Sequence, residues 1–212
     1  MRNYTGRTVF VGIDVHKKTY AITCICDNEI VKRDTLKASK EHLLSYLNKY
    51  FMGAKIKTAY EAGFSGFVLH RFLLAAEIEN IVVHAASIEI AARDRVKTDK
   101  RDSLKIAKQL SDGRLAGIYV PTPEREAYRE VSRMREKVAR DKRRVGNRLK
   151  SLLYRQGLLG ADDDDAVSQK WLKKVAAFEC SPSIKYSIQV CIDEWLFLKK
   201  KQKEIDEELA KQ

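Results

Sequence analysis

The chain has 212 residues, of which 41 are Lys or Arg and 29 are Asp or Glu, giving a formal net charge of +12. Its hydrophobic share of 44% allows a buried core. Its positive charge predicts a polyanionic partner, and nucleic acid is favoured over a membrane surface. No apolar run approaches the roughly 20 residues of a membrane span, and the first residues lack a signal-peptide pattern. We therefore expect a cytoplasmic protein that is not attached to a membrane.

The first half of the sequence predicts an α/β domain. Strand patterns cover residues 8–14, 19–26, 29–36, 55–61 and 78–85, and Asp27 with Asn28 suits a hairpin turn. Helix patterns cover residues 40–51, 65–76 and about 99–113, with a short helical piece at 87–93. Three meandering strands followed by alternating helices and strands predict a mixed five-stranded sheet with flanking helices.

The second half is predicted to be helical. A long basic helix is expected over residues 124–156, followed by a loop over 157–168 that contains four consecutive aspartates at 162–165. Two helical segments, 171–179 and 184–212, come next, and the apolar residues of the last one are spaced as in a coiled-coil seam. These residues are Ile184, Ile188, Cys191, Ile192, Trp195, Leu198, Ile205 and Leu209. We expect a first domain over 1–120, a basic helix over 121–158, and a coiled-coil or oligomerisation region over 159–212.

Four acidic residues stand out by their positions on these elements. Asp14 interrupts an otherwise apolar strand, Glu61 ends the fourth strand, and Asp99 and Asp102 lie one helical turn apart at the start of a helix. If the first and fourth strands are neighbours, the four carboxylates meet at one edge of the sheet. Such a cluster is tolerable when cations bind between the like charges, and oxygen ligands suit Mg²⁺ or Mn²⁺. Two such ions can serve phosphodiester chemistry.

Each of these acids also has a structural explanation. Asp99 can cap a helix and Asp102 can favour its positive end, while Glu61 can be an ordinary acid after a strand. His16 and Lys17 follow Asp14 directly and could contact a phosphate, or simply begin an exposed hairpin. Asp14 is the hardest of the four to explain by structure alone, because the strand around it is apolar.

Several motifs resemble the insertion-sequence-110 family of transposases and site-specific DNA recombinases, which includes the Piv-type invertases. They are GIDVHKKTY, AYEAG, RVKTDKRDSLKIAKQL and NRLKSLLYRQG. The resemblance implies a ribonuclease-H-like, RuvC-like domain whose DEDD tetrad binds Mg²⁺, and matched motif by motif the tetrad falls on Asp14, Glu61, Asp99 and Asp102. It also implies a coiled coil that forms a dimer or tetramer, DNA as substrate, and in some members a guide RNA.

The family pattern includes a C-terminal domain with a nucleophilic serine, and no match to it precedes Gln212. Strand exchange is therefore not expected of these residues alone. Two further functions stay open, a non-catalytic RNA-binding and dimerising module and a Mg²⁺-dependent nuclease of the junction-resolvase kind. A sugar-kinase-like ATPase also begins with a GIDV strand, but it needs phosphate-binding glycines where this chain has HKK.

Two basic segments are predicted to contact nucleic acid. One surrounds the second acidic pair and comprises Arg93, Arg95, Lys97, Lys100 and Arg101. The other lies on the long helix, where residues 124–158 hold 12 Lys or Arg against 5 Asp or Glu. Its predicted contact residues are Arg140, Lys142, Arg143, Arg144, Asn147, Arg148 and Lys150. The alternative, a solvated helix laced with Glu–Arg pairs, is favoured for residues 124–137.

Overall fold

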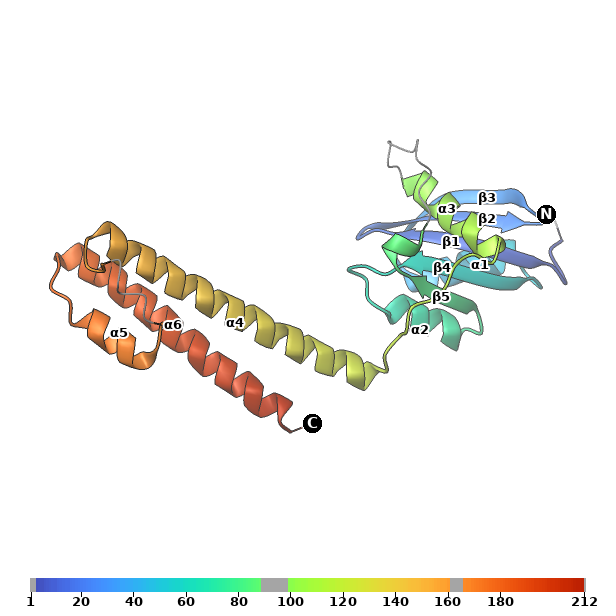
Figure 1. Cartoon of the computed structure of the whole chain (residues 1–212). Helices are drawn as coiled ribbons and strands as arrows, with labels where there is room; N and C mark the ends of the chain where they lie inside the picture. Colours follow the sequence, from blue (N-terminus) through green and yellow to red (C-terminus); the bar gives the residue numbers. More distant parts are fainter. Residues whose placement is uncertain (1–2, 89–98, 161–165, 212) are drawn as a thin grey trace. The chain divides into compact units, whose positions relative to one another are not determined.

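The computed structural model describes residues 3–88, 99–160 and 166–211, without the side chains of 99–101. The chain divides into two compact units, Met1–Val120 and Pro121–Gln212, shown in Figure 1. The four aspartates at 162–165, most of the predicted helical piece at 87–93, and Arg93, Arg95 and Lys97 lie outside the described residues. Each unit is described by itself below.

The N-terminal unit contains the predicted five-stranded mixed sheet. Its strands are β1 (Thr8–Val15), β2 (Thr19–Cys26), β3 (Glu29–Lys37), β4 (Lys55–Glu61) and β5 (Glu79–Val83). The order across the sheet is β3-β2-β1-β4-β5. The β1/β2 and β2/β3 pairs are antiparallel, whereas β1/β4 and β4/β5 are parallel. Asp27 and Asn28 form the predicted hairpin turn, both with positive φ, as a type I′ turn requires.

Helices cover both faces of this sheet. The helices are α1 (Lys40–Tyr50), α2 (Val68–Ala75) and α3 (Asp99–Ser111), with a short 3₁₀ turn at Ala85–Ser87. The fully buried Val9, Val11 and Ile13 of β1 share one core with the apolar sides of α1 and α2. Because strand side chains alternate between faces, Gly12 and Asp14 belong to the opposite face, which α3 covers.

Helix α2 begins three residues later than predicted. Gly66 adopts a left-handed conformation with φ of 59°, which interrupts a right-handed helix. Its carbonyl oxygen accepts a hydrogen bond from the hydroxyl of Tyr60 at 2.9 Å. The residues between β4 and α2 therefore form a turn held against the end of β4.

The second unit consists of α4 (Pro123–Arg155), α5 (Gln169–Ala176) and α6 (Pro182–Leu209). The long helix predicted from residue 124 begins at Pro123, because proline suits the first helical position and Thr122 caps it by accepting from the Arg125 amide. One apolar core joins the three helices, with Leu149 and Leu153 from α4, Trp171 from α5, and Ile192 and Trp195 from α6. The first half of the predicted seam on α6 is therefore buried within the chain. No described helix is long and apolar enough to cross a bilayer.

A polar relay crosses the α2 side of the sheet from β4 to β5 to α2. The hydroxyl of Thr58 donates to Oδ1 of Asn80 at 2.7 Å, so the Asn80 amide nitrogen faces Nδ1 of His70, also at 2.7 Å. Nδ1 must accept this hydrogen bond, which requires a neutral imidazole protonated at Nε2. Burial, and then the nearby charge of Arg71, lowers the pKa of His70 below its ordinary value of 6.5.

We expect the N-terminal unit to lose stability as the pH falls below about 6.5, because the unfolded state then binds a proton that the folded His70 resists. The free energy of unfolding, followed by far-ultraviolet circular dichroism in urea between about pH 8 and 5, should decline in the wild type. The His70→Gln variant, which cannot titrate, should decline less. An equal decline in both proteins would show that His70 is not responsible.

Candidate metal centre and nucleic-acid interface

Asp14 and Glu61 lie beside each other at the ends of neighbouring strands. In the parallel β1/β4 ladder Gly12 pairs with Ala59 and Ile13 with Tyr60, so the next residues along the two strands are Asp14 and Glu61. Both belong to the face that α3 covers, because they are two residues beyond Gly12 and Ala59. Adjacent strands are about 4.8 Å apart. The prediction that strands one and four are neighbours is confirmed. It places these two carboxylates at one edge of the sheet, where β1 and β4 reach their carboxyl ends.

Helix α3 is seated unusually close to β1. A Cβ atom added to Gly12 would lie closer than 3.0 Å to the carbonyl oxygen of Ser103 and to the backbone nitrogen of Ala107. The Ser103 hydroxyl also forms a 3.0 Å hydrogen bond with the hydroxyl of Thr23. Thr23 lies on β2, directly opposite Gly12 in the β1/β2 ladder. Ser103 and Thr23 are both almost completely buried. The start of α3 is thereby fixed over β1 and β2.

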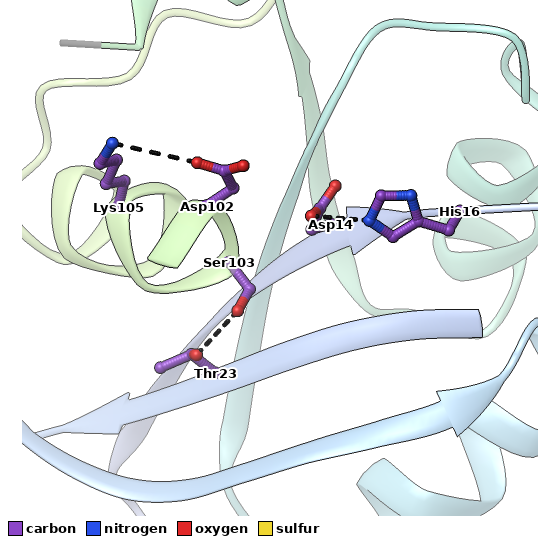
Figure 2. A network of polar contacts seen from close by, with 6 residues as sticks. All are labelled: Asp14, His16, Thr23, Asp102, Ser103 and Lys105. Atoms are coloured by element: carbon purple, nitrogen blue, oxygen red, sulfur yellow. Dashed lines mark hydrogen bonds and ion pairs between the residues drawn. The ribbon is translucent and has the colours of Figure 1, made fainter. Parts of the chain in front are cut away.

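This seating brings the second acidic pair to the same edge. Asp102 directly precedes Ser103 in α3, and Figure 2 shows it on the side of the sheet from which Asp14 projects. Asp99 begins the same helix, one turn earlier, and its side chain lies outside the described part. Three separate elements, β1, β4 and α3, therefore present acidic residues to one edge of the N-terminal unit.

Two of the described carboxylates, those of Asp14 and Asp102, have a side-chain nitrogen close by. Nε2 of His16 lies 3.0 Å from Oδ2 of Asp14, and the Asp14 side chain remains 19% exposed. Nζ of Lys105 lies 3.9 Å from Oδ1 of Asp102, whose side chain is 23% exposed. Partial exposure leaves these carboxylates accessible to a ligand, and the neighbouring nitrogens reduce the repulsion between them.

The donor chemistry of this edge fits a hard divalent cation. Carboxylate oxygens with room for water are the ligands that Mg²⁺ prefers. Among the side chains that the structure describes, no three or more His, Cys, Asp or Glu are already gathered closely enough to hold one ion. Asp14, Glu61 and Asp102 belong to three separate elements, and their described side chains do not form a ready-made ion site.

Two of the predicted contact residues on the basic helix α4 are paired with acidic residues. Nη2 of Arg148 lies 2.5 Å from Oε2 of Glu194 on α6, and Nη1 of Arg144 lies 3.2 Å from Oδ1 of Asp141. The Glu194 hydrogen bond raises the pKa of Arg148 above its usual value. A groove on the helical unit is lined by four other predicted contact residues, namely Lys142, Arg143, Asn147 and Lys150. Arg140 does not line it, and the side chains of Lys100 and Arg101 lie outside the described set.

Sequence reasoning missed residues that position the others. A glycine inside an apolar strand signals a close backbone approach, so Gly12 could have been recognised as the seat of a helix. The hydroxyl pair of Thr23 and Ser103 carries no such signal, because the two residues are 80 positions apart. Trp195 and Lys199 of α6 also line the groove. Trp195 was predicted only as part of the apolar seam, and no role was predicted for Lys199.

The family to which this chain belongs follows from comparison with known proteins. A family model described as Transposase, of the IS110 type with a DEDD site, matches residues 11–156. The chain is therefore a member of the IS110-type DEDD transposase family.

Three relatives show how much of the chain is shared. It is 33% identical over 157 residues to the transposase of insertion sequence element IS1533 from Leptospira borgpetersenii, covering 72% of this chain and 45% of that protein. It is 41% and 30% identical to the predicted transposases y4rJ and y4qE of Sinorhizobium fredii, covering 47% and 71% of this chain and 27% and 40% of theirs. The chain thus spans less than half the length of each of these relatives.

Proposed function

We propose that this chain is the metal-binding and nucleic-acid-binding portion of a DNA transposase, in which Asp14, Glu61, Asp99 and Asp102 hold Mg²⁺ for DNA strand cleavage and exchange. The observation that carries the proposal is the joint placement of Asp14, Glu61 and the start of α3 at one edge of the sheet. Mn²⁺ would substitute for Mg²⁺. The four carboxylates could supply ligands to two ions. Membership of the family supports DNA as the substrate.

The bound cation would polarise a phosphoryl oxygen and lower the pKa of a bound water, as divalent ions do in phosphodiester chemistry. The chain itself supplies the framework for this chemistry. The β1/β4 ladder fixes the spacing of Asp14 and Glu61, and the close seating of α3 sets the position of Asp102. His16 holds the carboxylate of Asp14 in one orientation through its 3.0 Å hydrogen bond.

The positive charge of the chain supports nucleic acid as its partner. Lys100 and Arg101 lie between the two acidic residues of α3 in sequence, and Arg93, Arg95 and Lys97 come just before them. Cations around a carboxylate site draw in a polyanion that the carboxylates alone would repel. Guidance by a structured RNA and assembly through the C-terminal helices complete the proposal, and both rest on the family resemblance.

The Asp14→Asn variant tests the catalytic role. We expect it to reduce Mg²⁺-dependent cleavage of a branched or nicked DNA substrate by at least about 10²-fold, the loss typical when a group that stabilises developing charge is removed. It should also weaken Mn²⁺ binding measured by titration calorimetry. The matched control is Asp112→Asn, which makes the same change at an exposed aspartate paired with Arg114.

The outcomes separate the candidate functions. Loss of both cleavage and Mn²⁺ binding in Asp14→Asn alone supports the proposal. Cleavage confined to branched DNA, with linear and nicked DNA left intact, would favour the junction-resolvase kind of nuclease. A wild-type chain that binds nucleic acid but neither cleaves DNA nor binds Mn²⁺ would instead be a non-catalytic module, and the proposed function would be wrong.

A further inference from the structure

The helical unit carries a groove of about 680 Å³ between α4 and α6, at the N-terminus of α5. Its cations are Arg135, Lys142, Arg143 and Lys150 from α4 and Lys199 from α6, and no acidic residue occurs among the described residues that line it. A concave surface that holds several charges of one sign focuses the electrostatic potential. The shape and the charge of this groove therefore favour an extended anion.

Trp195 lies in the groove and organises two of its cations. Nζ of Lys142 lies 5.5 Å from the centre of the Trp195 ring, and Nζ of Lys199 lies 5.8 Å from it. Both distances suit a cation–π attraction. Lys142 also donates a 2.5 Å hydrogen bond to Oε1 of Gln202. Because these contacts leave both ammonium groups positively charged, their charge remains available to an anion.

The same tryptophan limits how a ligand can be recognised. Its side chain belongs to the apolar core and the residue is only 6% exposed. A base cannot stack on a ring that is buried and covered by two lysines, which removes the usual platform for single-stranded bases. The groove instead offers cations together with the neutral side chains of Asn147, Gln169 and Gln202. All of these groups can donate hydrogen bonds to phosphate oxygens.

Several other cations of the helical unit are paired with carboxylates. Arg148 is paired with Glu194 and Arg144 with Asp141, and Lys201 lies 2.8 Å from Glu204. In the groove, Arg135 is paired with Asp206 through its Nε at 2.8 Å. A phosphate that contacts an ion-paired arginine must compete with a carboxylate, whereas Lys142 and Lys199 face a neutral amide and an aromatic ring.

We propose that this groove binds the phosphodiester backbone of a nucleic acid strand, through Lys142, Arg143, Lys150 and Lys199 and without reading its sequence. The inference rests on the proposed function and deepens it by naming the surface of the helical unit that holds the nucleic acid. Ser168 and Gln169 add the positive end of the α5 helix dipole to one wall of the groove.

The test is a triple substitution, Lys142→Gln, Arg143→Gln and Lys150→Gln, in the full chain. The binding of fluorescently labelled oligonucleotides is followed by anisotropy in EDTA, between about 50 and 200 mM salt. We expect affinity to fall by about 10²-fold or more and the slope of log K against log salt to become shallower by about three. Fluorescence of Trp171 and Trp195 reports whether the helical unit stays folded.

The control carries the same loss of three charges outside the groove, at cations that the structure pairs with acids. Its substitutions are Arg133→Gln, Lys201→Gln and Lys203→Gln. It should lose less than about tenfold in affinity, which general electrostatic attraction explains. Equal losses in the two triple variants, or no loss in the groove variant, would overturn the proposal.

Binding of different oligonucleotides identifies the kind of nucleic acid that the groove binds. DNA and RNA of one sequence, single-stranded and as duplexes, are compared with a scrambled sequence. Backbone recognition predicts equal binding of both sequences, and a preference of more than about tenfold for one of them would contradict it. Because no metal or cleavage enters this measurement, the inference can fail while the proposed catalysis holds, and the reverse is also true.

Discussion

Replacing Gly12 by alanine is expected to unfold or expand the N-terminal unit while the helical unit stays native. The added methyl group would lie closer than 3.0 Å to two backbone atoms of α3, in Ser103 and Ala107, and no side-chain rotation can relieve that contact. Either α3 moves away from β1 or the strand distorts. Overpacking of a core typically costs ~1–3 kcal/mol, and a backbone clash belongs at or beyond the upper end of that range.

The two units can be followed separately in this experiment. Both tryptophans of the chain, Trp171 and Trp195, lie in the core of the helical unit. Tryptophan fluorescence should therefore remain unchanged in Gly12→Ala, while amide hydrogen exchange accelerates in β1, β2 and α3. The control is Gly63→Ala, where the nearest atom to an added Cβ is the carbonyl oxygen of Glu61 at 4.0 Å. Comparable protection in the two variants would show that α3 is not seated on Gly12 in solution.

Truncating Leu149 to alanine is expected to produce the opposite pattern. Its side chain is fully buried among apolar residues of all three helices of the second unit. A Leu→Ala change at such a site removes ~2–5 kcal/mol of stability, through lost burial and the cavity that remains. Urea unfolding followed by tryptophan fluorescence should shift to a lower midpoint, whereas hydrogen exchange in the sheet should not change.

An exposed residue on the same helix provides the comparison for Leu149. Met134 is 50% exposed on α4, so Met134→Ala should change the free energy of unfolding by no more than about 0.5 kcal/mol. If Leu149→Ala also loosened the β-sheet, the two units would fold as one cooperative body. Their separate apolar cores would then not act independently.

Local patterns were sufficient to predict most of the fold. The apolar runs of β1 and β2 and the turn at Asp27 and Asn28 identified the sheet, because these signals depend on neighbours in sequence. The start of α2 was predicted too early, since the left-handed Gly66 and the Tyr60 hydrogen bond that holds it are tertiary features. The long helix begins one residue earlier than predicted, because Thr122 is its N-cap and Pro123 is its first residue.

The candidate site was only partly accessible to sequence reasoning. Asp14 was conspicuous because a carboxylate in an apolar strand is costly unless it has a partner, and its placement beside Glu61 followed from the expected parallel pairing. The role of His16 was left open between phosphate contact and hairpin start, and the structure places it on Asp14. The pairing of Arg148 with Glu194 and the lining of the groove could not be predicted, because both depend on which residues of α6 lie opposite α4.

The edge strand β3 has a consequence for the behaviour of this protein at high concentration. Among the strands that the structure describes, it pairs with β2 alone, so its outer side offers backbone groups to an approaching chain. This strand carries the cations Lys32, Arg33 and Lys37 and the acids Glu29 and Asp34. Nζ of Lys32 lies 3.1 Å from Oδ2 of Asp34 and 4.1 Å from the centre of the Tyr50 ring. A second copy that extended the sheet would have to bring these charged side chains out of water, so self-association by strand addition is disfavoured.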